Sequence, residues 1–191
     1  MARTKSAWFI FLLLALPLIA ACSTQDVSDE PVYTVITDGT LNAGDTIPEP
    51  TGDVIVTITG DIGITNVGDS IQMDREALNS VGVVEYAVLS PFDNVTITYR
   101  GILMSDLLNV WQVSDDATIL QMTALNDYAV EVPIDDLRAY PVMFAMQADG
   151  EAMPISTYGP AMLVYPYDDY EFDATVYNRY WIWQIKSIDV R

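Results

Sequence analysis

The alternation of apolar and polar residues predicts a domain built mainly from short β-strands. Residues 53–59 (DVIVTIT) alternate strictly, as expected for a strand with one face in the core, and Gly60 and Gly63 mark the turn that follows. Residues 142–147 are mostly apolar, which is typical of a buried strand. Further strands are predicted over residues 83–89, 95–99, 118–124, 128–132, 162–165 and 181–190.

Three short helices are predicted between these strands. Residues 74–81 (DREALNSV) have an acidic start that favours a helix, and residues 134–140 (IDDLRAY) form a helical turn after a proline. In the stretch TYRGILMSDLL, Gly101 is expected to turn the chain after a strand, and Ser105 is expected to cap the helix that follows. Strands interspersed with a few short helices predict a strand-rich α+β domain.

The beginning of the chain has the layout of an export signal. Residues 1–21 combine two basic residues with an apolar stretch too short for a comfortable membrane span. Residues 18–22 (LIAAC) resemble a bacterial lipobox, which implies cleavage before Cys22 and lipidation of its thiol. The alternatives are a plain signal peptide followed by a chance cysteine, or an apolar helix that is kept. Serine at position 23, directly after the cysteine, resembles the signal that sorts lipoproteins to the outer membrane. We therefore expect a periplasm-facing lipoprotein that is anchored in the outer membrane rather than in the inner membrane.

Three segments are predicted: a lipoprotein signal peptide over residues 1–21, a flexible acidic tether over 22–52 and the folded domain over 53–191. The tether is polar and rich in turns, although residues 32–36 can form an isolated strand. After cleavage the chain would carry six basic and 27 acidic residues, a formal net charge of −21. Such a charge repels nucleic acid and anionic lipid surfaces, so neither is an expected partner. The charge serves either as an acidic ligand-facing surface or as a solvating coat.

The residue types exclude several kinds of chemistry. The chain has no histidine, so Ser-His-Asp and Cys-His catalysis and histidine-bound metals are ruled out. Cys22 is the only cysteine, and lipidation would use its thiol. No glycine-rich phosphate loop of the P-loop or Rossmann type occurs. No catalytic or metal-binding residue is therefore assigned.

The segment from residue 153 to 183 is unusually rich in aromatic residues beside carboxylates. This combination can hold a polar ring or a sugar by stacking and hydrogen bonding, or it can simply pack tyrosines on a sheet with acids facing water. Asp169, Glu171 and Asp173 alternate as calcium ligands can, but the glycine of an EF-hand is missing. Asp127, Asp168 and Asp169 are available for glycoside cleavage, yet no spacing singles out an acid and a base.

Four blocks of the domain resemble the oxidoreductase molybdopterin-binding domain family, which has the sulfite-oxidase-like fold. YRGILMSDLL (residues 99–108) is similar to that family's (W/F)xGVxLxDLL, and TALNDYAVEVP (123–133) is similar to its DGYxxxIP. VMFAMQADGEAM (142–153) and GPAMLVYP (159–166) resemble LLAYxMNGxPL…GxPxRLVVP, and the end of the chain resembles the family's final strand. The words NDYAVE and YPYDD look like those of a small exported subgroup.

The chain departs from this resemblance where the family binds its metal. The family's molybdenum-ligating cysteine would lie within residues 86–92, but this stretch contains no cysteine, and its candidate replacement is the hydroxyl of Ser90. Serine is a poor substitute, because molybdenum in this setting is matched to a soft, anionic sulfur. The family's histidine and several basic residues that meet the pterin pyrophosphate also lack equivalents, and its lysine near the last strand falls on Ile182 or Trp183.

We therefore expect a lipoprotein that uses the inherited cleft to bind a small molecule or an envelope protein, with no bound cofactor and without molybdenum catalysis. The alternative is a divergent oxidoreductase that still uses molybdopterin or another redox cofactor, so enzyme activity stays open. Arg100 and Arg179 are hydrogen-bond donors for a pocket or partners in salt bridges. The residues predicted to contact a ligand are Ser90, Phe92, Arg100, Asn126, Tyr128, Tyr167, Asp168, Arg179 and Trp181.

Overall fold

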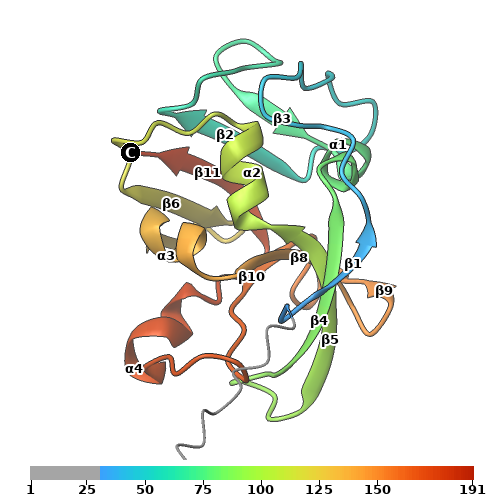
Figure 1. Ribbon diagram of the computed structural model, residues 1–191, viewed down its shortest axis with the longest axis vertical. Coiled ribbons are helices and arrows are strands. Elements are labelled where there is room, and N and C mark those ends of the chain that lie inside the picture. Colours follow the sequence, from blue (N-terminus) through green and yellow to red (C-terminus); the bar gives the residue numbers. More distant parts are fainter. Residues whose placement is uncertain (1–30) are drawn as a thin grey trace, which may run out of the picture. The chain divides into compact units, whose positions relative to one another are not determined.

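The computed structural model describes residues 31–191, which fold into two β-sheets and a few short helices (Figure 1). The first sheet has the strand order β1-β4-β5-β8-β10, with β9 paired to β8, and the second has the order β3-β2-β11-β6-β7. The strands are β1 (Thr34–Thr37), β2 (Val56–Gly60), β3 (Ile71–Met73), β4 (Val83–Leu89), β5 (Thr96–Leu103), β6 (Ile119–Ala124), β7 (Ala129–Pro133), β8 (Met143–Ala148), β9 (Glu151–Ala152), β10 (Met162–Val164) and β11 (Ile185–Val190). The helices are α1 (Arg75–Ser80), α2 (Met104–Val110), α3 (Ile134–Ala139), α4 (Ala174–Tyr177) and the 3-10 helix η1 (Asn178–Tyr180).

The two sheets differ in how their strands are connected. Every pair in the first sheet is antiparallel, whereas in the second sheet β11 runs parallel to β2 and antiparallel to β6. The last strand of the chain therefore lies in the middle of the second sheet, between two strands that are far from it in sequence (Figure 1). The second sheet is therefore complete only when the last strand of the chain has paired with β2 and β6.

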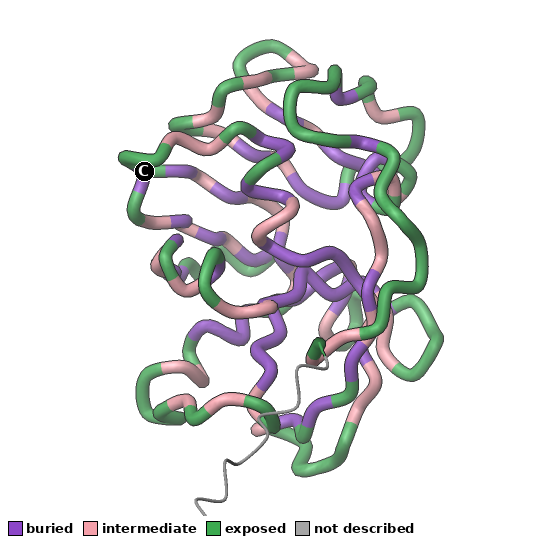
Figure 2. Tube along the Cα trace, in the orientation of Figure 1, coloured by how far each residue is buried: buried purple, intermediate pink, exposed green. Residues whose placement is uncertain are grey.

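The core follows from the burial pattern of the strands. In β6 buried and half-buried residues alternate, and in β7 buried residues alternate with exposed ones, so one face of this hairpin lies in the core. All three residues of β10 and the first four of β8 are buried, as their apolar sequences predict. Figure 2 shows the buried residues running along the strands, with exposed residues in the connecting loops.

The stretch TYRGILMSDLL is built differently from the prediction. Gly101 does not turn the chain but lies inside β5, where the register with β8 shifts. A Cβ atom at this position would lie 2.1 Å from the carbonyl oxygen of Phe144, so only glycine fits between the two strands. The helix α2 begins one residue before Ser105, after Leu103, and no side chain of the described residues caps it. The backbone N–H of Met104 instead donates to the carbonyl of Val142 at 2.8 Å.

The expected flexible tether is wrong over residues 31–52. Residues 34–37 form β1, which pairs with β4 at the edge of the first sheet, and Ile47 is 1 % exposed. The backbone N–H groups of Thr40 and Leu41 both donate to the carbonyl of Ser80. The segment is polar, but a few apolar side chains and the edge of an existing sheet are enough to fix it. The signal peptide, Cys22 and the start of the tether lie outside the described residues. No helix between residues 31 and 191 has the length and apolar character to cross a membrane.

Asp74 ties this N-terminal segment to the domain. One of its carboxylate oxygens accepts the N–H of Ala77 at 2.9 Å and so caps helix α1, and the other accepts the N–H groups of Thr51 and Gly52 at 2.8 and 2.9 Å. The side chain is 4 % exposed. These backbone donors favour the charged form, so the pKa of Asp74 lies below its ordinary value of 3.8.

We expect Asp74→Ala to lower the free energy of unfolding by about 2–3 kcal/mol, because it removes a helix cap and strands two further backbone donors. Urea unfolding at neutral pH measures this loss, with exposed Asp69→Ala as the matched control. The pKa of Asp74 is depressed in the folded state, so its contribution is complete above pH 3.8 and disappears as the pH falls through the lower folded value. A stability difference from wild type that stays constant down to pH 2 would contradict the assignment.

Candidate functional site

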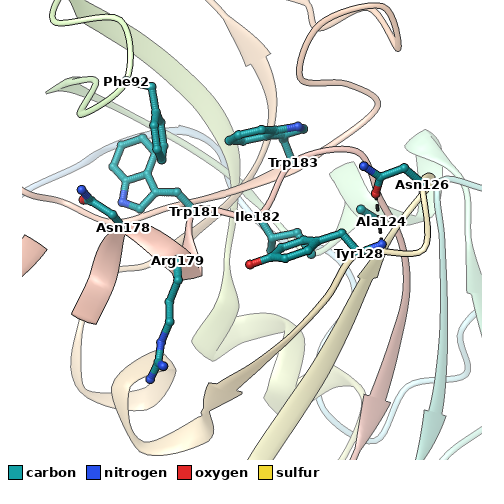
Figure 3. Close-up of a pocket in the computed structure, with 9 residues that line it drawn as sticks. All are labelled: Phe92, Ala124, Asn126, Tyr128, Asn178, Arg179, Trp181, Ile182 and Trp183. Atoms are coloured by element: carbon teal, nitrogen blue, oxygen red, sulfur yellow. Dashed lines mark hydrogen bonds between the residues drawn. The ribbon is translucent and has the colours of Figure 1, made fainter. Parts of the chain in front are cut away.

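The candidate site is a cavity of about 330 Å³ where three segments meet (Figure 3). The turn after β4 contributes Phe92, the hairpin between β6 and β7 contributes a second wall, and the segment that leads into β11 contributes the floor. The nine lining residues are Phe92, Ala124, Asn126, Tyr128, Asn178, Arg179, Trp181, Ile182 and Trp183.

The floor exists because the predicted strand over residues 181–190 begins only at residue 185. Residues 178–180 form η1, and residues 181–184 cross from the first sheet to the second without regular structure. The crossing is held on both sides, since the N–H of Leu163 donates to the carbonyl of Ile182, and the N–H of Leu125 donates to the carbonyl of Gln184, both at 2.9 Å. Gln184 takes a left-handed backbone conformation with φ 57°. Trp181, Ile182 and Trp183 thus line a cavity instead of standing in a strand.

Aromatic rings form most of the surface of the cavity. Trp181 is 1 % exposed, whereas Trp183 and Phe92 are 37 % and 44 % exposed at the mouth. The ring of Phe92 lies edge-to-face on both indoles, with centroid distances of 6.2 Å to Trp181 and 5.5 Å to Trp183. Tyr167 supports Trp181 from behind at 5.3 Å. The result is a buried indole floor below an open rim of rings.

A network around Ser90 fixes the turn that carries Phe92. The Ser90 hydroxyl donates to a carboxylate oxygen of Asp93 at 2.9 Å and accepts the N–H of Asp93 at 3.2 Å. The hydroxyl of Tyr158 donates to the same carboxylate at 2.9 Å. Burial, and then the bond to Asp93, raise the pKa of Tyr158 above its ordinary value. Ser90 is 2 % exposed and fully engaged in this turn, so it positions Phe92 and does not line the cavity.

The β6–β7 hairpin presents Tyr128 to the cavity. The Asn126 side-chain oxygen accepts the N–H of Tyr128 at 3.1 Å, and Asp127 lies between them with φ 66°. Asp127 also accepts a hydrogen bond from Lys186 at 2.5 Å, which lowers the pKa of Asp127. This exposed ion pair contributes little to stability but pins the turn to β11.

The polar groups of the cavity are mainly hydrogen-bond donors. The oxygen of Asn126 is engaged with the hairpin and that of Asn178 accepts the hydroxyl of Tyr167 at 3.0 Å, which leaves the two amide NH₂ groups free to donate. The indole N–H of Trp181 is buried and makes no hydrogen bond of normal geometry within residues 31–191. It lies near enough to the oxygen of Tyr167 to lower the pKa of that phenol, but burial dominates and raises this pKa to about 12.

Arg179 stands at the mouth and is the only charged residue among those that line the cavity. Its guanidinium donates to the hydroxyl of Tyr180 at 2.8 Å and lies over the ring of the same residue, 4.8 Å from the centroid. Arg179 and Tyr128 also line a second, adjoining cavity of about 560 Å³. Figure 3 shows the Arg179 side chain extending away from the Trp181 ring.

The structure brings together five of the nine predicted contact residues: Phe92, Asn126, Tyr128, Arg179 and Trp181. Two others lie next to the cavity without lining it, because Ser90 is used in its turn and Tyr167 packs behind Trp181. Asp168 is exposed and accepts the N–H of Leu89 at 3.1 Å.

Arg100 is not part of the site. Its side chain pairs with Glu85 on the neighbouring strand and lines a separate cavity beside Ile36. The sequence offered no means of telling Arg100 from Arg179, since which face of a sheet an arginine occupies depends on the register of its strand. The lining residues that sequence reasoning missed are Ala124, Asn178, Ile182 and Trp183. For Trp183 the signal was present, in the aromatic run Tyr180-Trp181-Ile182-Trp183.

The acidic loop that follows β10 does not gather metal ligands. No group of three or more histidine, cysteine or acidic side chains comes together within residues 31–191 in a way that would hold a metal ion. Asp173 is used as the N-cap of α4, where it accepts the N–H of Thr175 at 2.9 Å. The calcium hypothesis for Asp169, Glu171 and Asp173 therefore has no support in the structure.

Comparison with known proteins defines the class of this domain. Residues 75–169 match the family described as the oxidoreductase molybdopterin binding domain. The chain belongs to this family, as its four sequence blocks predicted. No curated protein matches the chain.

A solved structure supports the same fold. The crystal structure of the sulfane dehydrogenase SoxCD from Paracoccus pantotrophus is similar with a TM-score of 0.55 and 17 % sequence identity, over 72 % of this chain and 38 % of that chain. The predicted strand-rich α+β, sulfite-oxidase-like fold is confirmed. The chain spans less than two fifths of the SoxCD chain that it matches.

We expect Tyr158→Phe to loosen the turn that carries Phe92, because it removes the donor to Asp93. The free energy of unfolding should fall by about 1 kcal/mol, and the amides of residues 92–94 should exchange faster with solvent. Tyr170→Phe is the matched control, since no described residue accepts or donates a hydrogen bond at the Tyr170 hydroxyl. Equal exchange in both variants would show that this bond does not hold the turn.

Proposed function

We propose that the protein is an exported lipoprotein whose molybdopterin-oxidoreductase-like domain binds a small organic molecule in the aromatic cavity and does not carry out molybdenum catalysis. The observation that carries this proposal is the set of side chains at the cavity. It consists of four aromatic rings, two amides and one guanidinium, and it contains neither a thiolate nor an imidazole. Such a surface suits an organic ring.

The side-chain oxygens within residues 86–92 do not replace the sulfur ligand of a molybdenum centre. The resemblance places the family's cysteine within residues 86–92, and the polar side chains there have other partners. The hydroxyl of Tyr86 donates to the carbonyl of Val164 at 2.8 Å in the core, and Ser90 is engaged with Asp93. Neither oxygen is a soft anionic ligand. This mismatch supports the proposed loss of the metal chemistry.

The charge at the cavity argues in the same direction. The resemblance places a family lysine at Ile182 or Trp183, and both of these residues line the cavity as apolar surface. A pyrophosphate would bring at least two negative charges to a mouth where Arg179 is the only cation among the lining residues. The divergent-oxidoreductase alternative would need backbone groups to supply the missing compensation.

Export and anchoring are proposed from the sequence of residues 1–22. Acylation at Cys22 would provide stable attachment to a membrane without a spanning helix. The strongly acidic domain would then face the periplasm, repelled by anionic lipid headgroups, and would reach a small molecule or an envelope protein there.

We expect Cys22→Ser to release the full-length protein from the membrane fraction of a diderm bacterial host, because serine cannot accept the thioether-linked lipid. Fractionation followed by mass spectrometry of the N-terminal peptide measures both the location and the acyl mass. Ser23→Ala is the matched control and should stay in the membrane fraction. An unmodified Cys22 in a protein that is still exported would leave a plain signal peptide as the correct interpretation.

We expect the full-length chain, purified in detergent from cells that make molybdenum cofactor, to contain far less than one molybdenum per chain and no pterin fluorescence after oxidation. A molybdenum enzyme purified from the same cells controls for cofactor supply. The aromatic part of the proposal is checked with N-phenyl-1-naphthylamine, an uncharged fluorescent probe. Its binding should weaken about tenfold in Trp183→Ala, which removes a rim ring, and stay unchanged in Val35→Ala on the remote edge strand. Stoichiometric pterin would establish the redox alternative instead.

A further inference from the structure

The chemistry of the cavity also specifies the kind of molecule that it binds. Resting on the proposed function, we infer that the ligand is an aromatic carboxylic acid: a planar ring held among the indoles, joined by a short arm to one carboxylate held by Arg179. Three separate features of the site lead to this assignment.

The first feature is the shape and surface of the ring site. A cavity of about 330 Å³ is at the small end of the range for ligand sites and suits one or two fused rings. Phe92 and Trp183 meet edge-to-face at the mouth, above the buried Trp181. A flat ring in the cavity would pack against these rings and cover the exposed parts of both side chains.

The second feature is the bias toward donors. The side-chain oxygens of Asn126 and Asn178 are already used as acceptors, so each residue offers its NH₂ group to a ligand. No carboxylate is among the lining residues. These groups favour a ligand that carries acceptor oxygens over one that carries donors.

The third feature is the state of Arg179. The sequence has 27 acidic and eight basic residues, of which three acidic and two basic precede residue 31, so the described part has 24 acidic and six basic residues. With four carboxylates for each cation, most cations find one: Arg100, Arg138, Lys186 and Arg191 all do. Within the described part Arg75 and Arg179 form no ion pair, and of these two only Arg179 lines the aromatic cavity, where Tyr180 orients it.

An arginine held by a neutral phenol keeps most of its N–H groups free. The guanidinium of Arg179 has five donors and uses one of them on the Tyr180 hydroxyl, so a forked contact with a carboxylate is still available. Tyr128 lines both the aromatic cavity and the adjoining cavity that Arg179 shares, so an arm passing Tyr128 connects the ring to the guanidinium. The one carboxylate among the residues that line the adjoining cavity, Glu131, pairs with Arg191 at 3.9 Å.

The charge of the domain limits the ligand to one negative charge. Arg179 compensates one carboxylate, but a second charge would face the field of 24 acidic residues without a partner. A cationic ring is the opposite possibility, because the field attracts cations and aromatic faces bind them. Against it, the only charged side chain at the cavity is Arg179, which repels an ammonium group.

Three probes with the same ring and arm separate these cases. We would titrate 3-(2-naphthyl)propionate, 3-(2-naphthyl)propan-1-ol and 3-(2-naphthyl)propylammonium into the full-length protein by calorimetry. The acid should bind about tenfold more tightly than the alcohol, because its carboxylate gains one charge-assisted contact with Arg179. The ammonium compound should bind more weakly than either, because Arg179 repels its positive charge. Arg179→Gln should abolish the preference for the acid while binding of the alcohol is retained. Arg138→Gln on α3 is the matched control and should keep the wild-type preference.

The outcomes also separate this inference from the proposed function. If the alcohol or the ammonium compound binds as well as the acid, or if Arg179→Gln keeps the preference, the assignment of an aromatic acid is wrong while the aromatic cavity remains a binding site. If none of the three compounds binds and the affinity for N-phenyl-1-naphthylamine is the same in Trp183→Ala as in wild type, both the aromatic-acid assignment and the proposed function are wrong.

Discussion

The crossing of the chain from the first sheet to the second at residues 181–184 is the constraint on which the rest of the site depends. The segment is anchored to β10 through Leu163 and to the β6–β7 hairpin through Leu125, and it then enters the middle of the second sheet as β11. Because both neighbours fix it, the segment cannot relax into a longer strand. Three of its side chains line the cavity, with Trp181 and Ile182 buried and Trp183 at the mouth.

The same crossing supplies the side chains on which the proposed binding of a different ligand rests. The domain has the fold of its family, and in this chain only Gly101 permits the close approach of β5 and β8. A buried serine network and an apolar residue, Ile182 or Trp183, stand where the resemblance implies sulfur and a lysine. Function is decided by such sites and not by the fold that carries them.

Electrostatics sets the terms under which this cavity can work. A domain with so few cations uses most of them to tie its own carboxylates, as Lys186 does for Asp127. Arg179 forms no ion pair with a described carboxylate, and its guanidinium instead donates to the Tyr180 hydroxyl and lies over the ring of Tyr180. The acidic surface repels anions in general, whereas the oriented guanidinium of Arg179 attracts an anion at the mouth of the cavity.

The sequence by itself determined the class of the domain and the identity of most strands. It also determined which kinds of chemistry are excluded, because the domain contains neither histidine nor cysteine. These properties depend on local alternation, on motifs and on composition, all of which are legible along the chain. It also indicated the run of large side chains over residues 180–183, three of which line the cavity.

Only the tertiary structure decided which residues meet. Arg100 and Arg179 look alike in sequence, yet strand register puts the first beside Glu85 and η1 puts the second at the cavity mouth. The segment over residues 31–52 reads as a tether, but the open edge of β4 recruits part of it as β1. In each case the outcome depends on partners distant in the chain, and the energy of those contacts appears only once the sheets have formed.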